Sequence, residues 1–205
     1  TDTYSAIAAA VGSLKGPKHG GANRQVLAQF SLIKQTVRDW KDDDAVADCV
    51  GRILRRELGD GSGLIYGMGH AVYTLSDPRT VILRQSARTL AAQRGMLDEL
   101  ELMEAVERVT PRVFAEVTGH EKVMCANVDM YSGLIYQMLD IPPDLFTPLF
   151  AVARITGWCA HRMEEVLTGG RLYRPAYKSL TRHREYIPMA ARTYRKNPLP
   201  AEKRD

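Results

Sequence analysis

Apolar side chains recur every three or four residues along most of this chain, and this spacing constrains its fold more than any other feature. Such a period places apolar side chains on one face of an α-helix. No segment alternates apolar and polar residues over the length of a strand, and no long internal repeat is visible. The sequence therefore predicts an all-α fold. The predicted helices span about residues 3–11, 22–37, 44–58, 78–94, 97–110, 111–118, 129–139 and 147–168, the first being the last turns of a helix.

Glycine and proline mark the predicted ends of these helices. Gly12–Gly21 contains four glycines and a proline, and Gly59–Gly69 is again glycine-rich, so both segments are predicted to be loops. Asp77 and Pro78 are the residue types that favour the N-cap and the first position of a helix. Pro111 is expected to end one helix and begin the next, because proline has no backbone N–H to donate.

Composition and cysteine spacing indicate the kind of compartment in which the protein is expected to fold. The chain has 205 residues, 45% of them hydrophobic, which is ordinary for a globular protein. Cys49, Cys125 and Cys159 are odd in number and form no CxxC pair, which argues against a disulfide framework and a thiolate metal site. We expect neither a targeting segment nor a membrane span within this sequence. We therefore expect a reducing compartment, either the bacterial cytoplasm or an organelle matrix, and not secretion.

Basic residues are concentrated at the C-terminus. Residues 171–205 contain ten Lys and Arg against three Asp and Glu, a charge of +7, which leaves −3 on residues 1–170. A basic tail can bind nucleic acid. Leu172, Tyr177 and Ile187 lie among these charges, however, and favour a segment that wraps over a neighbouring subunit. We therefore expect neither nucleic acid nor a membrane as a partner.

Three titratable side chains occupy predicted junctions between a loop and a helix: His19, His70 and Asp129. His70 follows Gly67-Met68-Gly69 and precedes the predicted helix start at Asp77, and Arg79 falls in the first turn of that helix. Free N–H groups and the helix dipole favour an anion at such a start. Taken singly, each histidine is more simply a surface or structural residue, and Asp129 an N-cap. Together they indicate a site for a small carboxylate or phosphate.

Several motifs together resemble the citrate synthase family. They are GPKHGGAN (16–23), GMGHAVYTLSDPR (67–79), NVDMYSG (127–133), Arg154 with Gly157 and His161, and RLYRP (171–175). The resemblance implies an all-α homodimer with a large and a small domain, and a division of this chain into 1–19 (large domain), 20–134 (small domain) and 135–205 (return to the large domain with the basic tail). A complete member has roughly twice this length, so the chain is expected to be a fragment or one piece of a split enzyme.

The resemblance also implies a reaction and its residues. It is the condensation of acetyl-CoA with oxaloacetate to give citrate and CoA at the entry to the tricarboxylic acid cycle. Asp129 would be the base, His19 the donor to the thioester oxygen, and His70 the donor to the ketone of oxaloacetate. The carboxylates would bind Arg79, Arg154 and Arg174, the last reaching the partner's site. The implied contacts with the CoA adenine are the backbone of Leu64, Ile65, Tyr66, Gly67, Met68 and Gly69. No metal or other cofactor is implied.

Other hypotheses stay open from the sequence. A 2-methylcitrate synthase would use propionyl-CoA with the same residues, and one methylene changes selectivity by only about 1–3 kcal/mol. The chain could also be a non-catalytic helical module that dimerises or binds CoA weakly. His161 and Glu165 are spaced like metal ligands on a helix, but two ligands do not make a site, and a solvent-facing pair is the simpler interpretation.

Overall fold

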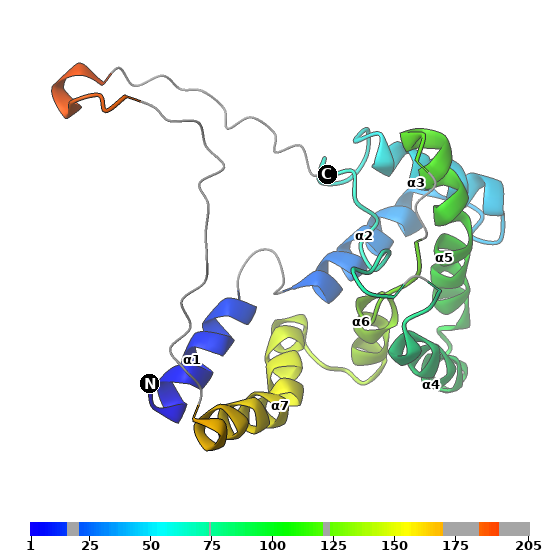
Figure 1. Ribbon diagram of the computed structural model, residues 1–205. Coiled ribbons are helices and arrows are strands. Elements are labelled where there is room, and N and C mark those ends of the chain that lie inside the picture. Colours follow the sequence, from blue (N-terminus) through cyan, green and yellow to red (C-terminus); the bar gives the residue numbers. More distant parts are fainter. Residues whose placement is uncertain (16–20, 74, 121–123, 170–184, 193–205) are drawn as a thin grey trace. The chain divides into compact units, whose positions relative to one another are not determined.

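The computed structural model describes residues 1–15, 21–73, 75–120, 124–169 and 185–192. This described part consists of helices and loops without a β-strand, which confirms the predicted all-α fold. The elements are α1 (Thr3–Leu14), α2 (Ala22–Thr36), α3 (Asp43–Leu54), α4 (Pro78–Arg94), α5 (Leu97–Thr118), α6 (Asp129–Met138), η1 (Pro143–Leu145), α7 (Phe146–Thr168) and η2 (Met189–Ala191) (Figure 1).

The main hydrophobic core lies among α2, α3, α4, α5 and α6. Residues Thr1–Thr168 form one compact unit and Gly169–Asp205 a second. Within the first unit, α3 packs against α5, α6 packs against both α2 and α4, and α1 packs against α7 (Figure 1). The most deeply buried core side chains include Val26, Ile33, Val46, Val50, Leu100, Val106, Tyr131 and Leu134.

The predicted boundaries of α4 are confirmed. Asp77 is its N-cap, with a carboxylate that accepts a hydrogen bond from the Arg79 backbone N–H at 3.0 Å, and Pro78 is the first helical residue. Gly95 ends α4 and Gly119 ends α5, both in the left-handed conformation. Glycine adopts this conformation without a Cβ clash, and the resulting turn satisfies carbonyls that a helix end leaves unpaired.

Two other boundaries differ from the prediction. α1 runs from Thr3, with Asp2 as its N-cap, through Gly12 to Leu14, so it extends three residues into the segment predicted to be a loop. α3 ends at Leu54, earlier than predicted, and Arg56 takes a φ of +65° while Glu57 N–H donates to the Arg52 carbonyl at 2.9 Å. The backbone thus closes a C-terminal turn before Gly59, and no glycine is needed there.

The predicted break at Pro111 is wrong. α5 runs without interruption from Leu97 to Thr118 with Pro111 inside it. An internal proline costs a helix about 3 kcal/mol. Here the helix has core-facing residues on both sides of the proline, because Val106, Val109 and Val113 are all buried and α5 packs along α3. Burial of this stripe offsets the lost backbone hydrogen bond.

The helices α1 and α7 expose many apolar side chains. Phe146 is the one buried residue of α7. Exposed apolar residues on these two helices include Tyr4, Val11, Val152, Ile155, Met163, Val166 and Leu167. Apolar surface of this extent is typical of a protein interface. None of the described helices is long and apolar enough to span a lipid bilayer.

Candidate active site

The loop that precedes His70 is joined to the segment that precedes Asp129. Gly69 N–H donates to the Cys125 carbonyl at 2.8 Å, and Asn127 N–H donates to the Gly67 carbonyl at 2.8 Å, on either side of an isolated antiparallel bridge between Met68 and Ala126. The bridge therefore joins two segments that are distant in the sequence. One segment continues into His70 and the other into α6.

Gly67 allows this bridge to pack against α6. Its φ is +86°, and a Cβ built on it would lie 2.8 Å from Sδ and 2.9 Å from Cα of Met130. Only glycine fits so close to a neighbouring backbone. The conformational freedom of Gly67 therefore serves the close approach of α6.

The orientation and tautomer of His70 are set by its own loop. Its Nδ1 accepts hydrogen bonds from the backbone N–H groups of Val72 and Tyr73, both at 3.0 Å, and its ring lies 4.6 Å from the Tyr73 ring. Since Nδ1 accepts, the proton of the neutral imidazole must be on Nε2. His70 can therefore donate one hydrogen bond from Nε2 to a ligand oxygen.

Asp77 holds the guanidinium of Arg79 at the start of α4. The buried Asp77 carboxylate accepts from Arg79 Nε at 3.0 Å and from Nη2 at 2.7 Å, in addition to its capping bond. The hydrogen bond from Arg79 lowers the pKa of Asp77, and the nearby His70 acts in the same direction. The same hydrogen bond, made to Asp77, raises the pKa of Arg79. The Arg79 cation is thus fixed in position through its Nε and Nη2 groups, and Asp77 accepts no hydrogen bond from its Nη1 group.

This pair makes the stability of the protein depend on pH. We expect Asp77→Asn to lower the free energy of unfolding by about 1 kcal/mol at neutral pH, a modest value because 46% of the Arg79 side chain is exposed. The pKa of Asp77 is depressed in the folded state, so its contribution is present above the unfolded pKa of about 4 and is lost as pH falls through the folded pKa. Urea unfolding at pH 7 and at pH 3 measures this difference.

The control for this experiment is the exposed Asp98, which is 3.6 Å from Lys41 on the surface. Asp98→Asn should change stability by less than about 0.5 kcal/mol at either pH. A destabilisation by Asp77→Asn that is as large at pH 3 as at pH 7 would contradict the charged pairing with Arg79.

Asn127 positions the start of α6 relative to His70. Its Nδ2 donates to the Gly69 carbonyl at 3.0 Å, and its Oδ1 accepts from Asp129 N–H at 3.0 Å. One amide therefore connects the residue before His70 to Asp129 itself. This role of Asn127 was not among the sequence predictions, although its position two residues before Asp129 and an amide's ability to donate and accept point to a bond with the start of α6.

A second contact fixes α6 on its other side. The buried Tyr131 hydroxyl donates to the Glu107 carboxylate of α5, which also pairs with Arg84 of α4 at 3.7 Å. Burial, followed by the bond to Glu107, raises the pKa of Tyr131. The phenol therefore stays neutral and holds α6 against α4 and α5.

The charges of Arg79, Asp129 and Arg154 act on one another. Burial lowers the pKa of Arg154, the positive charge of Arg79 lowers it further, and the negative charge of Asp129 opposes both. Asp129 also raises the pKa of Arg79. The Arg154 guanidinium lies 3.8 Å from the Phe150 ring centroid on the first turns of α7. Residues at the starts of α4 and α6 and on α7 are therefore close enough for their charges to interact.

Other predicted residues are placed differently. His19 and Arg174 lie outside the described residues. His161 pairs at 3.5 Å with Glu164, rather than with Glu165, on an exposed face of α7. Among the described residues, no group of three or more His, Cys, Asp or Glu side chains is arranged to hold a metal ion.

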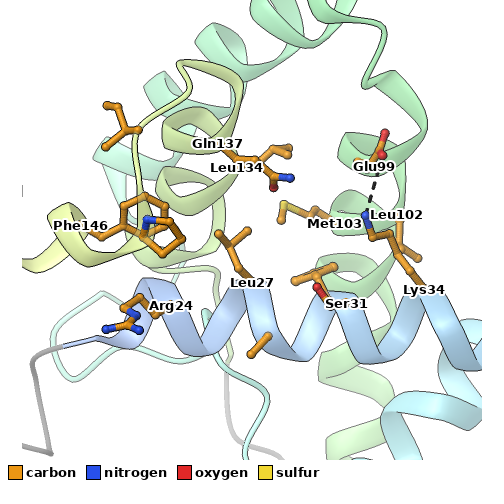
Figure 2. Close-up of a pocket in the computed structure, with 14 residues that line it drawn as sticks. Arg24, Leu27, Ser31, Lys34, Glu99, Leu102, Met103, Leu134, Gln137 and Phe146 are labelled. Atoms are coloured by element: carbon orange, nitrogen blue, oxygen red, sulfur yellow. Dashed lines mark ion pairs between the residues drawn. The ribbon is translucent and has the colours of Figure 1, made fainter.

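A separate cavity of about 460 Å³ lies among α2, α5, α6 and the start of α7. Figure 2 shows the Lys34–Glu99 ion pair on one side of it and Arg24 further along α2, with Leu27, Met103 and Leu134 between them. Among the predicted site residues that the structure describes, none lines this cavity. The candidate active site is therefore the region of His70, Arg79, Asp129 and Arg154.

Comparison with known proteins identifies the family. Residues 1–176 match the family described as citrate synthase, C-terminal domain. Citrate synthase from Synechocystis is 41% identical over 94% of this chain and 44% of the relative, and 2-methylcitrate synthase 1 from Corynebacterium glutamicum is 37% identical over 94% and 45%. Citrate synthase from Thermoplasma acidophilum, solved with carboxymethyl coenzyme A and oxaloacetate, superimposes with a TM-score of 0.69 at 32% identity, over 93% of this chain and 47% of that one. The chain spans about half the length of these relatives and belongs to the citrate synthase family.

Proposed function

We propose that this chain is part of an acyltransferase that condenses acetyl-CoA with oxaloacetate to give citrate and CoA. In this proposal residues 1–19 and 135–205 belong to the large domain and 20–134 to the small domain, and no metal or other cofactor takes part. The observation that supports it best is the bridge between Met68 and Ala126, which joins the His70 loop to the segment that leads into Asp129. Asp77 fixes the guanidinium of Arg79 nearby, and the charges of Arg79 and Arg154 both interact with that of Asp129. A dianion such as oxaloacetate needs fixed, planar cations of this kind.

Each residue has a distinct task in the proposed reaction. Asp129 removes a proton from the methyl group of acetyl-CoA, while a donor on the thioester oxygen stabilises the enol that forms. The enol carbon then attacks the ketone carbon of oxaloacetate, the enol oxygen loses its proton, and the thioester carbonyl re-forms. The ketone π bond opens, and its oxygen, hydrogen-bonded by His70 Nε2, takes up a proton to become the hydroxyl of the product. Water cleaves the thioester of the product and releases CoA. The bound molecules of the Thermoplasma structure, an acetyl-CoA analogue and oxaloacetate, support this pair of ligands.

Two tasks fall on residues outside the described part. By family resemblance, His19 is the donor to the thioester oxygen, and Arg174 binds a carboxylate in the partner subunit of a homodimer. The exposed apolar residues of α1 and α7 support an interface on these helices. We propose that the remainder of the large domain and the second subunit cover them.

The choice of acyl group is a second question. Relatives named 2-methylcitrate synthase match this chain at 37% and 35% identity, so propionyl-CoA is the alternative substrate. The coverage of only about half of each relative favours a further alternative, in which the 205-residue chain alone is a non-catalytic helical module.

The test is oxaloacetate-dependent release of free CoA from acetyl-CoA and from propionyl-CoA. The protein expressed from its complete gene should release CoA with a higher kcat/KM for acetyl-CoA. Residues 1–205 alone should show no appreciable turnover, because closure over the substrates needs both domains. A preference for propionyl-CoA would establish the alternative substrate, and no oxaloacetate-dependent release by the complete protein would disprove the condensation.

A further inference from the structure

The segment Leu64–Tyr66 needs a partner to hold its shape. It lies in the loop between α3 and α4, which contains five glycines with positive φ, at positions 59, 61, 63, 67 and 69. Such residues give a loop many accessible conformations in the absence of other contacts. The C-terminal part of this loop is held by the bridge of Gly67 and Gly69 to residues 125–127. Leu64 and Tyr66 precede this bridge.

Within the loop, Leu64 N–H donates to Ser62 Oγ at 3.2 Å and Met68 N–H donates to the Ile65 carbonyl at 3.1 Å. Gln29 of α2 is a partner from outside the loop. Its Nε2 donates to the Leu64 carbonyl at 2.9 Å, and its Oε1 accepts from Tyr66 N–H at 3.0 Å. One side-chain amide thus pairs with the segment as a neighbouring strand would, while Ile65 between the two bonds is buried. On the other side, the Tyr66 hydroxyl donates to Asp60 at 2.6 Å.

The position of Gln29 on α2 indicates that its polarity serves the loop. Val26, Phe30 and Ile33 on the same helix are buried core residues, and Gln29 itself is only 8% exposed. An apolar side chain at this position would be buried without a desolvation cost, whereas a buried amide is tolerated only when it is hydrogen-bonded. The two partners that satisfy it are both backbone groups of the Leu64–Tyr66 segment.

We propose that Gln29 is a positioning residue for acyl-CoA, which fixes the Leu64–Tyr66 backbone for contact with the CoA adenine and takes no part in binding oxaloacetate. This inference rests on the proposed function and on the CoA contacts that the family resemblance implies for this segment. The loop then has two independent attachments. Gln29 fixes the backbone of the part that contacts CoA, whereas Asn127 and the bridge fix the backbone next to His70.

Gln29→Met tests this separation, because methionine has nearly the same length and shape but cannot replace either hydrogen bond. In the protein expressed from its complete gene, we expect the KM for acetyl-CoA to rise about tenfold, which corresponds to about 1.4 kcal/mol of lost binding. The KM for oxaloacetate and kcat should stay within about twofold of wild type. Gln25→Met is the matched control, since Gln25 lies on the same helix beside the same 610 Å³ cavity and is exposed. It should change neither KM.

Amide hydrogen exchange on residues 1–205 gives a readout that does not need turnover. In Gln29→Met, the Tyr66 amide should exchange faster, while the Gly69 amide, held by Cys125, should keep its wild-type rate. Equal increases in both KM values, a fall in kcat, or faster exchange at Gly69 would assign Gln29 a general structural role and overturn the inference. An unchanged KM for acetyl-CoA in an active enzyme would overturn the inference alone, whereas an inactive wild-type enzyme would overturn the proposed function and the inference together.

Discussion

Asp129→Asn is expected to lower kcat for condensation by about 10²- to 10⁴-fold, the usual loss when a positioned general base is removed. Asparagine has nearly the same shape as aspartate but cannot accept the methyl proton. The bond from Asn127 is made to the backbone N–H of residue 129, so the start of α6 should keep its place. The KM for oxaloacetate should change little or fall, because Arg79 and Arg154 no longer have the Asp129 carboxylate as a competitor for the substrate carboxylates.

The measurement is steady-state release of CoA by the protein expressed from its complete gene, with circular dichroism and thermal unfolding to establish that the variant folds. Asp144→Asn is a suitable control, since this aspartate is exposed and pairs at 3.5 Å with Arg24, which is itself more than half exposed. Its kcat should stay within about twofold of wild type. If Asp129→Asn kept more than about a tenth of the wild-type kcat, another group would have to be the base.

Gly67→Ala is expected to have the largest effect on stability, lowering the free energy of unfolding by about 3 kcal/mol. Two costs add in this variant. A non-glycine residue at a φ of +86° is strained by about 1–2 kcal/mol, and the new methyl group would overlap Cα and Sδ of Met130, which adds about 1–3 kcal/mol of overpacking. The overlap with Cα cannot be relieved by a change of rotamer, so α6 itself must move.

Urea unfolding of the 205-residue chain measures this loss, and Gly61→Ala separates its two parts. Gly61 has a φ of +75°, but a Cβ there would meet no atom within 4 Å. Gly61→Ala should therefore show the backbone strain alone, about 1 kcal/mol. Similar losses in the two variants would mean that the close approach of Met130 to Gly67 contributes nothing to stability.

Much of the fold follows from interactions between residues close in the sequence. The apolar period predicts the helices, Asp77-Pro78 predicts the start of α4, and Gly95 and Gly119 predict the ends of α4 and α5. These signals are reliable because an N-cap or C-cap bonds to groups within about four residues of itself. The local rule failed at Pro111, where burial of one continuous face of α5 outweighs the cost of a proline.

The candidate site divides in the same way. Family motifs in the sequence predict which side chains take part, and the placement of Arg79 beside its own N-cap Asp77 is local. The bond from Asn127 to Gly69 and the bonds from Gln29 to Leu64 and Tyr66 could not be predicted from the sequence, because they join residues distant along the chain. A polar side chain in a core or loop gives no indication of which distant backbone it will meet.

By itself, then, the sequence determined the helical class, the ends of α4 and α5, and the chemical character of His70, Arg79 and Asp129. Only the tertiary structure decided that the segments leading to His70 and to Asp129 are joined by one β-bridge. It also decided that the charges of Arg79, Asp129 and Arg154 interact, and that Gln29 hydrogen-bonds to the loop. The reason is the separation along the chain: the bonds from Gln29 and Asn127 to this loop join residues 35 to 58 positions apart, and packing of α2, α4 and α6 brings those residues together.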